Sequence, residues 1–252
     1  MALRPRLILV AFLLVNCLCT ASGWSQTKDM ANMPGMSDMS GMDHNNSSEP
    51  AIRNPETRTS ELNHRLVGFI LVLASVFLLA DEISNKRYTP IRYVWPVCLL
   101  IAGIFVLIFS DAEIWPFGPL TPWYALTHSL EDLQHKGFAV ILLSLGYVEF
   151  RRAGGKFQGA FPALFFPVFA TLGAILLLFH VHGGEMSGPD AMKVMVHIQT
   201  QHRWFAATGL GIAVAKAMAD IPQRHQRTLQ RVWPALLTIL GILLMAYTES
   251  MR

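Results

Sequence analysis

The stretch LVGFILVLASVFLLA, residues 66–80, contains no charged side chain and no proline. It is shorter than the roughly 20 apolar residues that a helix needs to cross a bilayer, but its flanks can extend it. The whole chain has 252 residues, of which 52% are hydrophobic and 15% charged, and its mean hydropathy is +0.38. This composition is too apolar for an ordinary soluble domain and indicates an all-α membrane protein.

Five further apolar runs follow the first, and together the six runs predict a six-transmembrane-helix bundle. Polar flanks such as residues 127–136 and 191–203 can bring the shorter runs to spanning length. No internal repeat is evident among the runs. The predicted spans are residues 66–80, 93–110, 137–150, 161–181, 204–218 and 232–247.

The N-terminal 23 residues have the features of a cleavable secretory signal peptide. Arg4 and Arg6 precede the apolar run 7–18, and the small residues 21–23 follow it. The alternative is an uncleaved first helix. Residues 24–63 are then expected to form a disordered periplasmic tail and linker, and residues 64–252 the transmembrane domain. Cleavage leaves Cys98 as the one cysteine, so no intramolecular disulfide is expected.

The basic residues predict the orientation of the spans. They are concentrated in the loops that lie inside if the mature N-terminus is outside. The sequence therefore predicts a bacterial inner-membrane protein with its tail in the periplasm. The chain has no concentrated basic patch, so no nucleic-acid partner is expected. The inner-loop residues are Lys86, Arg87, Arg92, Arg151, Arg152, Lys156, Arg224, Arg227 and Arg231.

Methionine recurs at every third position of the tail, and a histidine follows. Methionine normally fills gaps in a core, but this polar stretch offers no core. Thioethers are soft ligands that select ions such as Cu(I), and an extended chain with about three residues per turn would place all the sulfurs on one side. The alternative is a disordered tail that is rich in methionine by chance. The predicted ligands are Met30, Met33, Met36, Met39, Met42 and His44.

Eight of the nine histidines map to the predicted outer side, and only His225 maps to the inner side. One outer group has helical spacing i, i+3, i+4 and i+7, which predicts a single helix face with Thr127 or Ser129 as its cap. Imidazoles with carboxylates between them form a ligand set or a ligand pair with its orienting partners. The alternative is a solvated amphipathic turn. The group comprises His128, Glu131, Asp132 and His135.

A second group lies at the end of the fourth run, where Gly183 and Gly184 are expected to terminate the helix. An ionisable group at the depth of His180 is a candidate for function. The alternative is an interfacial histidine bonded to a backbone carbonyl. The predicted ligands are His180, His182, Glu185 and Met186.

The third group begins the fifth span, where Met195, Gln199 and His202 share a helical face. We expect His202 rather than His197 to be buried, because His202 adjoins the membrane run. His64 directly precedes the first span and would complete a cluster drawn from four helices. The alternative for His64 is an ordinary interfacial residue.

A set of neutral imidazoles suits copper, zinc, iron or haem iron, and the methionines favour copper. The chain has no HExxH, Walker, GxSxG or CxxC motif and no nucleophile beside a base, so a hydrolytic enzyme has no support. A metal-dependent redox enzyme stays open, although nothing specifies its substrate.

Three segments give the chain a resemblance to a known family. They are His64-Arg65, HVHGGEM at 180–186 and QTQHRWFAATG at 199–209. Over roughly residues 63–248 the chain resembles the bacterial copper-resistance protein D family of polytopic inner-membrane proteins. The resemblance implies copper handling at the periplasmic face and uptake across the membrane. It also implies an architecture shared with di-haem cytochromes, from which this chain departs because its inner face offers only His225.

The leading hypothesis is therefore a copper-binding inner-membrane protein of copper homeostasis. Its tail would capture Cu(I), with a periplasmic copper carrier as a further partner, and the histidines would receive the ion for relay, storage or transport. Binding has more support than transport, because no string of ligands connects the two faces. One alternative is a membrane b-type cytochrome, in which His64 or His135 pairs with His180 or His202 on one haem b. The other is a scaffold subunit of a membrane complex.

Overall fold

The computed structural model of the protein describes residues 55–84, 90–111, 113–114, 117–180, 191–221 and 226–249. The predicted signal peptide and the predicted ligands of the tail lie outside these residues. So do three ligands predicted after the fourth span, namely His182, Glu185 and Met186.

The described residues contain six long helices and one short helix. They contain no strand beyond an isolated bridge between Ile114 and Leu120. Each predicted apolar run lies wholly or mainly within one long helix. The all-α prediction is therefore confirmed for the described part of the chain. The helices are α2 (Pro55–Ile83), α3 (Ile91–Phe109), α4 (Pro122–His128), α5 (Leu130–Ala153), α6 (Ala160–Leu178), α7 (Ala191–Ala219) and α8 (Gln226–Met245).

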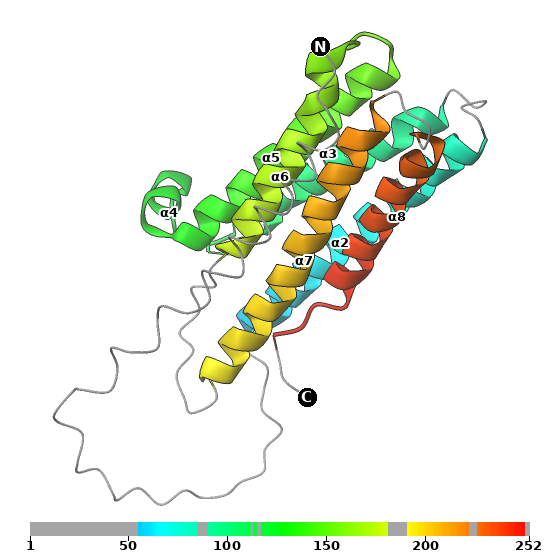
Figure 1. Cartoon of the computed structure of the whole chain (residues 1–252). Coiled ribbons are helices and arrows are strands. Elements are labelled where there is room, and N and C mark those ends of the chain that lie inside the picture. Colours follow the sequence, from blue (N-terminus) through cyan, green and yellow to red (C-terminus); the bar gives the residue numbers. More distant parts are fainter. Residues whose placement is uncertain are drawn as a thin grey trace, which may run out of the picture. The chain divides into compact units, whose positions relative to one another are not determined.

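The six long helices run alongside one another in a bundle (Figure 1), and their contacts close them into a ring. Each one packs against its neighbours in the order α2, α3, α5, α6, α7, α8, and α8 closes the ring against α2. The short helix α4 packs on α5. The ring therefore has an interior bounded by all six helices, and one end of it holds the N-terminal turns of α5 and α7.

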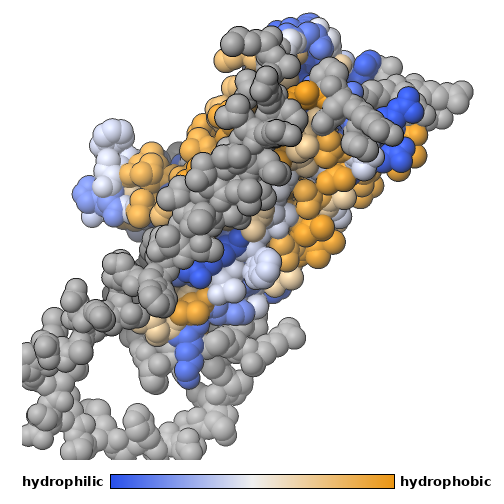
Figure 2. All heavy atoms as spheres, viewed as in Figure 1, coloured by the Kyte–Doolittle hydropathy of each residue, from blue (hydrophilic) through white to orange (hydrophobic). Residues whose placement is uncertain are grey.

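The outer surface of the bundle is apolar. Four helices, α2, α3, α6 and α8, are long and apolar enough to cross a membrane, and at most a third of each apolar window is buried inside the bundle. Their outward side chains include Phe69, Ile101, Leu164 and Ile242, each at least half exposed. Figure 2 shows such side chains along the helices, with hydrophilic ones gathered towards the ends. A soluble protein does not expose so much apolar surface, so the bundle belongs in a lipid bilayer.

Small residues allow neighbouring helices to approach closely, as is common in membrane bundles. Gly68 of α2 faces Gly241 of α8, and a Cβ at Gly68 would lie 2.5 Å from the Gly241 carbonyl oxygen and 2.8 Å from the Met245 nitrogen. Gly103 and Gly146 make the corresponding approach between α3 and α5. Because the obstructing atoms at Gly68 belong to the backbone, a larger residue there must push α8 away.

We expect Gly68→Ala to destabilise the bundle by about 1–3 kcal/mol, the usual cost of overpacking. Gly173→Ala is the matched control, since a Cβ there would meet only Ile141 methyl carbons at 3.8 and 3.9 Å. Helix propensity alone favours alanine at both positions. Thermal unfolding in detergent, followed by tryptophan fluorescence, compares the two. Equal melting temperatures for both variants would show that the α2–α8 contact is looser than described.

Candidate functional site

Four histidines from four parts of the ring meet at one end of the bundle. His64 lies on α2, His135 on α5 and His202 on α7, while His180 directly follows the end of α6. Ring centroids are 5.1 Å apart for His135 and His180, 5.0 Å for His180 and His202, and 6.0 Å for His202 and His64. His180 and His202 are buried. We call these four residues the histidine cluster.

Every imidazole in the cluster contacts a hydrogen-bond acceptor through Nδ1. Nδ1 of His64 lies 2.8 Å from the Ser60 carbonyl oxygen, and Nδ1 of His202 lies 2.9 Å from the Ile198 carbonyl oxygen. A carbonyl oxygen only accepts, so Nδ1 must carry the proton in both rings. The lone pair of each neutral ring is then on Nε2, the arrangement found in metal-binding histidines whose other nitrogen is held by a neighbouring group.

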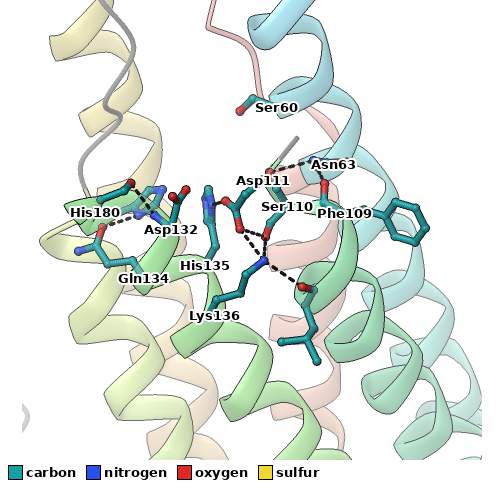
Figure 3. Close-up of polar contacts among 12 residues, drawn as sticks. Ser60, Asn63, Phe109, Ser110, Asp111, Asp132, Gln134, His135, Lys136 and His180 are labelled. Carbon is teal, nitrogen blue, oxygen red and sulfur yellow. Dashed lines mark hydrogen bonds and ion pairs between the residues drawn. The ribbon is translucent and has the colours of Figure 1, made fainter. Parts of the chain in front are cut away.

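Gln134 fixes the tautomer of His180 (Figure 3). Its amide nitrogen donates to the Phe179 carbonyl oxygen at 2.8 Å, and this sets which end of the amide is the oxygen. That oxygen, Oε1, lies 2.8 Å from Nδ1 of His180 and therefore accepts from it. The lone pair of His180 is again on Nε2.

Asp111, just after α3, holds the fourth histidine. Its carboxylate lies 2.5 Å from Nδ1 of His135 and 2.6 Å from Nζ of Lys136 (Figure 3). Burial acts to raise the pKa of Asp111, but the hydrogen bonds and charges of His135 and Lys136 outweigh it and hold the pKa below its usual value. Burial likewise acts to lower the pKa of His135, and the Asp111 carboxylate outweighs it and raises the pKa. Both groups lie outside the apolar part of α5.

A carboxylate adjoins this part of the cluster. One ligand atom each of Glu131, His135 and His180 lie within 4.8 Å of one another, a spacing that a metal ion can bridge. Asp132 is not part of this group. Its side chain is buried in the first turn of α5, where burial, helped by the carboxylates of Asp111 and Glu113, raises its pKa to about 7.

The predicted single face through His128 and His135 is wrong. Ser129 is extended, with φ −117° and ψ 117°, and it separates α4 from α5. His128 is exposed, stacks on Tyr124 at 4.1 Å and takes no part in the cluster. The predicted cap is confirmed at Ser129, whose hydroxyl oxygen accepts from the Asp132 N–H at 3.2 Å. The same residue ends one helix and begins the next, and this change of direction moves His128 away.

The fourth predicted span also ends earlier than expected. Helix α6 stops at Leu178, not at Gly183, because its last turn tightens to i→i−3 hydrogen bonds from the N–H groups of Phe179 and His180. His180 therefore leaves the helix and turns towards the cluster. On α7, His202 is buried as predicted, whereas Met195 is 44% exposed and lies about 10 Å along the helix from His202.

Besides Gln134, two residues of the site have no counterpart in the sequence prediction. Asp111 is one, and its signal is an acidic residue directly after an apolar run. The other is Tyr247, which is fully buried, stacks on His64 at 4.0 Å and lies 5.7 Å from the His202 ring. Its hydroxyl donates to Glu249 at 3.1 Å. From the sequence it was placed only as the last residue of the sixth apolar run.

Comparison of the chain with protein-family models, with curated proteins and with solved structures gave no match. The class of protein is therefore defined by the fold and the site alone: a helical membrane bundle with four converging histidines at one end.

We expect Asp111→Asn to lower the pKa of His135, because the loss of the carboxylate leaves burial as the largest influence on the ring. A histidine ring titration by NMR in detergent micelles measures this. Glu113→Gln is the control, since Glu113 is exposed and contributes to the pKa of Asp132 rather than to that of His135. An unchanged His135 pKa in Asp111→Asn would show that the contact is not made in solution.

Proposed function

We propose that the protein is a copper-binding membrane protein of copper homeostasis and that the histidine cluster is its binding site. The single observation that carries this proposal is the common state of the four rings. Each holds its Nδ1 against an oxygen acceptor, so each neutral ring has the Nε2 lone pair that a metal ion takes up. Four rings fixed in this way, from four separate elements, are an arrangement that packing alone does not require.

The choice of ion combines the cluster with the tail. Imidazole and carboxylate ligands suit zinc, copper and iron alike, and Glu131 adds one carboxylate to the cluster. The thioethers of residues 30–42 suit only the soft ions among these. A protein that offers both ligand types is best matched by copper, captured as Cu(I) by the tail and passed to the cluster. This scheme expects a periplasmic copper carrier as a partner. Among known families it favours the copper-resistance protein D family as the family of this protein.

In the proposed topology all six long helices cross a bacterial inner membrane, with the histidine cluster on the periplasmic side. The charged residues near the other end of α5 and α7 support the crossing of these two helices, because they are paired. Lys216 lies 2.7 Å from Asp220, and Arg152 bridges Asp220 and Glu149 at 3.3 and 2.7 Å. Paired charges at the end of a span cost much less than isolated ones within it.

Purified protein titrated with Cu(I) against a competing chelator tests the proposal. We expect His180→Ala and His202→Ala to lose the membrane site. Gln134→Leu should weaken it by about 10–100-fold, the usual effect of removing the group that orients a histidine ligand. His128→Ala is the matched control, because His128 is exposed outside the cluster. Affinity and stoichiometry that do not change in any cluster variant would refute copper binding at this site.

The absorption spectrum of the same sample separates a bound ion from haem b. After expression with added haem, a Soret band that disappears in His180→Ala would replace copper with the cytochrome alternative. A sample with bound copper and no Soret band supports the proposal.

A further inference from the structure

The chain contains a threefold internal repeat, contrary to the expectation from the apolar runs. An amide residue, a histidine and a basic residue occur in succession three times. An aromatic residue followed by proline lies 31 positions after each histidine. The triplets are Asn63-His64-Arg65, Gln134-His135-Lys136 and Gln201-His202-Arg203, and the aromatic–proline pairs are Trp95-Pro96, Phe166-Pro167 and Trp233-Pro234.

The three copies have the same local structure. In each, the triplet lies in the first helix of a hairpin and the aromatic–proline pair lies inside the second. The amide nitrogen of each triplet donates to a backbone carbonyl at the end of the second helix or within three residues beyond it. Asn63 donates to Phe109 at 2.8 Å, Gln134 to Phe179 at 2.8 Å and Gln201 to Thr248 at 2.7 Å. The repeat is therefore a helical hairpin held together by the same hydrogen bond three times.

The hairpins also pack on one another in a cyclic manner. The second helix of each contacts the first helix of the next, as α3 with α5, α6 with α7 and α8 with α2. The residue 39 positions after each histidine makes this contact and is small in every copy. Gly103 faces Leu143, Ala174 faces Gly209 and Gly241 faces Gly68. Three equivalent hairpins in a closed ring define a pseudo-threefold axis along the bundle.

One end of this axis carries the histidines. His64, His135 and His202 are equivalent residues, and the position 45 residues further on lies between successive histidines. His180 occupies it between His135 and His202, and Tyr247 occupies it between His202 and His64. Between His64 and His135 the corresponding residue is Phe109, which is exposed. Asp111 contacts His135 in its place. We call this the histidine end.

The other part of the axis carries the three aromatic rings. Ring centroids are 5.7 Å apart for Trp95 and Trp233, 5.4 Å for Phe166 and Trp233, and 6.5 Å for Trp95 and Phe166. All three side chains are buried. The Lys216 ammonium is also buried, 5.3 Å from the Trp233 ring centroid and 6.0 Å from that of Phe166. We call this the aromatic end.

We propose that the binding site is open at one end only. Ions reach the histidine cluster and leave it at the histidine end, and the aromatic end closes the axis. This inference rests on the copper binding proposed above. It states that the protein binds copper ions without transporting them across the membrane. The three equivalent rings fill the space around their common axis with apolar side chains. The Lys216 ammonium, paired with Asp220, occupies the space beside two of these rings and adds to the closure by filling it.

Sided labelling of a cysteine tests the closure without any metal. His64→Cys is prepared in a chain whose three native cysteines are replaced by alanine. It is then treated with an impermeant maleimide in right-side-out and in inverted membrane vesicles. His128→Cys marks the histidine end, and Lys156→Cys marks the opposite end, since both residues are exposed there. We expect His64→Cys to be labelled in the vesicles that label His128→Cys and not in those that label Lys156→Cys. Labelling in both preparations, or in neither, would overturn the proposal.

Copper release from wild-type protein gives the second readout. An impermeant Cu(I) chelator should remove bound copper when the histidine end faces the outside of the vesicle and leave it in place in the inverted vesicles. Removal from both preparations would show that ions pass the aromatic end. Protein that binds no copper would refute the proposed function instead, and the maleimide labelling would still decide whether the aromatic end is closed.

Discussion

Polar groups surrounded by apolar side chains and lipid must find partners within the protein, and the histidine end depends on this constraint. The last carbonyl groups of a helix have no partner within it. At the ends of α3 and α6 the amide side chains of Asn63 and Gln134 supply one, and Gln201 binds the Thr248 carbonyl three residues beyond α8. Each of these bonds joins the two helices of a hairpin at the level of the histidine beside the amide. The same three hydrogen bonds therefore provide partners for these carbonyl groups and fix the positions of the imidazoles.

The sequence predicted the features that depend on local composition. Each apolar run became a helix, and His64, His135, His180 and His202 came together from the four segments expected to supply them. The errors arose where a helix end depends on its surroundings. Ser129 separates α4 from α5, and α6 stops at Leu178, where the Gln134 side chain takes the Phe179 carbonyl. The end of α6 does not follow from local spacing, because Gln134, which binds the Phe179 carbonyl, lies on the neighbouring helix.

Asp111 and Tyr247 show a second limit of sequence reasoning. Asp111 contacts a histidine 24 positions later in the chain, and Tyr247 stacks on one 183 positions earlier. Only the ring closure of α8 on α2 brings the latter pair together. The repeat, in contrast, can be recognised from the sequence alone. It is inconspicuous because the copies share few residues between the histidine and the aromatic–proline pair. Position 14 after each histidine illustrates how far the copies have diverged, since it holds Leu78, Glu149 and Lys216, all buried.

The divergence of the copies gives the cluster two different sides. Near His135 it contains the charges of Asp111, Lys136 and Glu131, whereas near His64 it contains the stacked ring of Tyr247. Carboxylate ligands suit the harder ions, such as Mg²⁺ and Mn²⁺, while imidazole ligands suit copper, zinc and iron. The rigid helices, not the ion, set the positions of these groups, because each imidazole is already held at Nδ1. The cluster is thus preorganised but not selective by itself. Under the copper binding proposed above, selectivity for copper would come from the thioethers of residues 30–42, because the ligands of the cluster would also accept a harder ion.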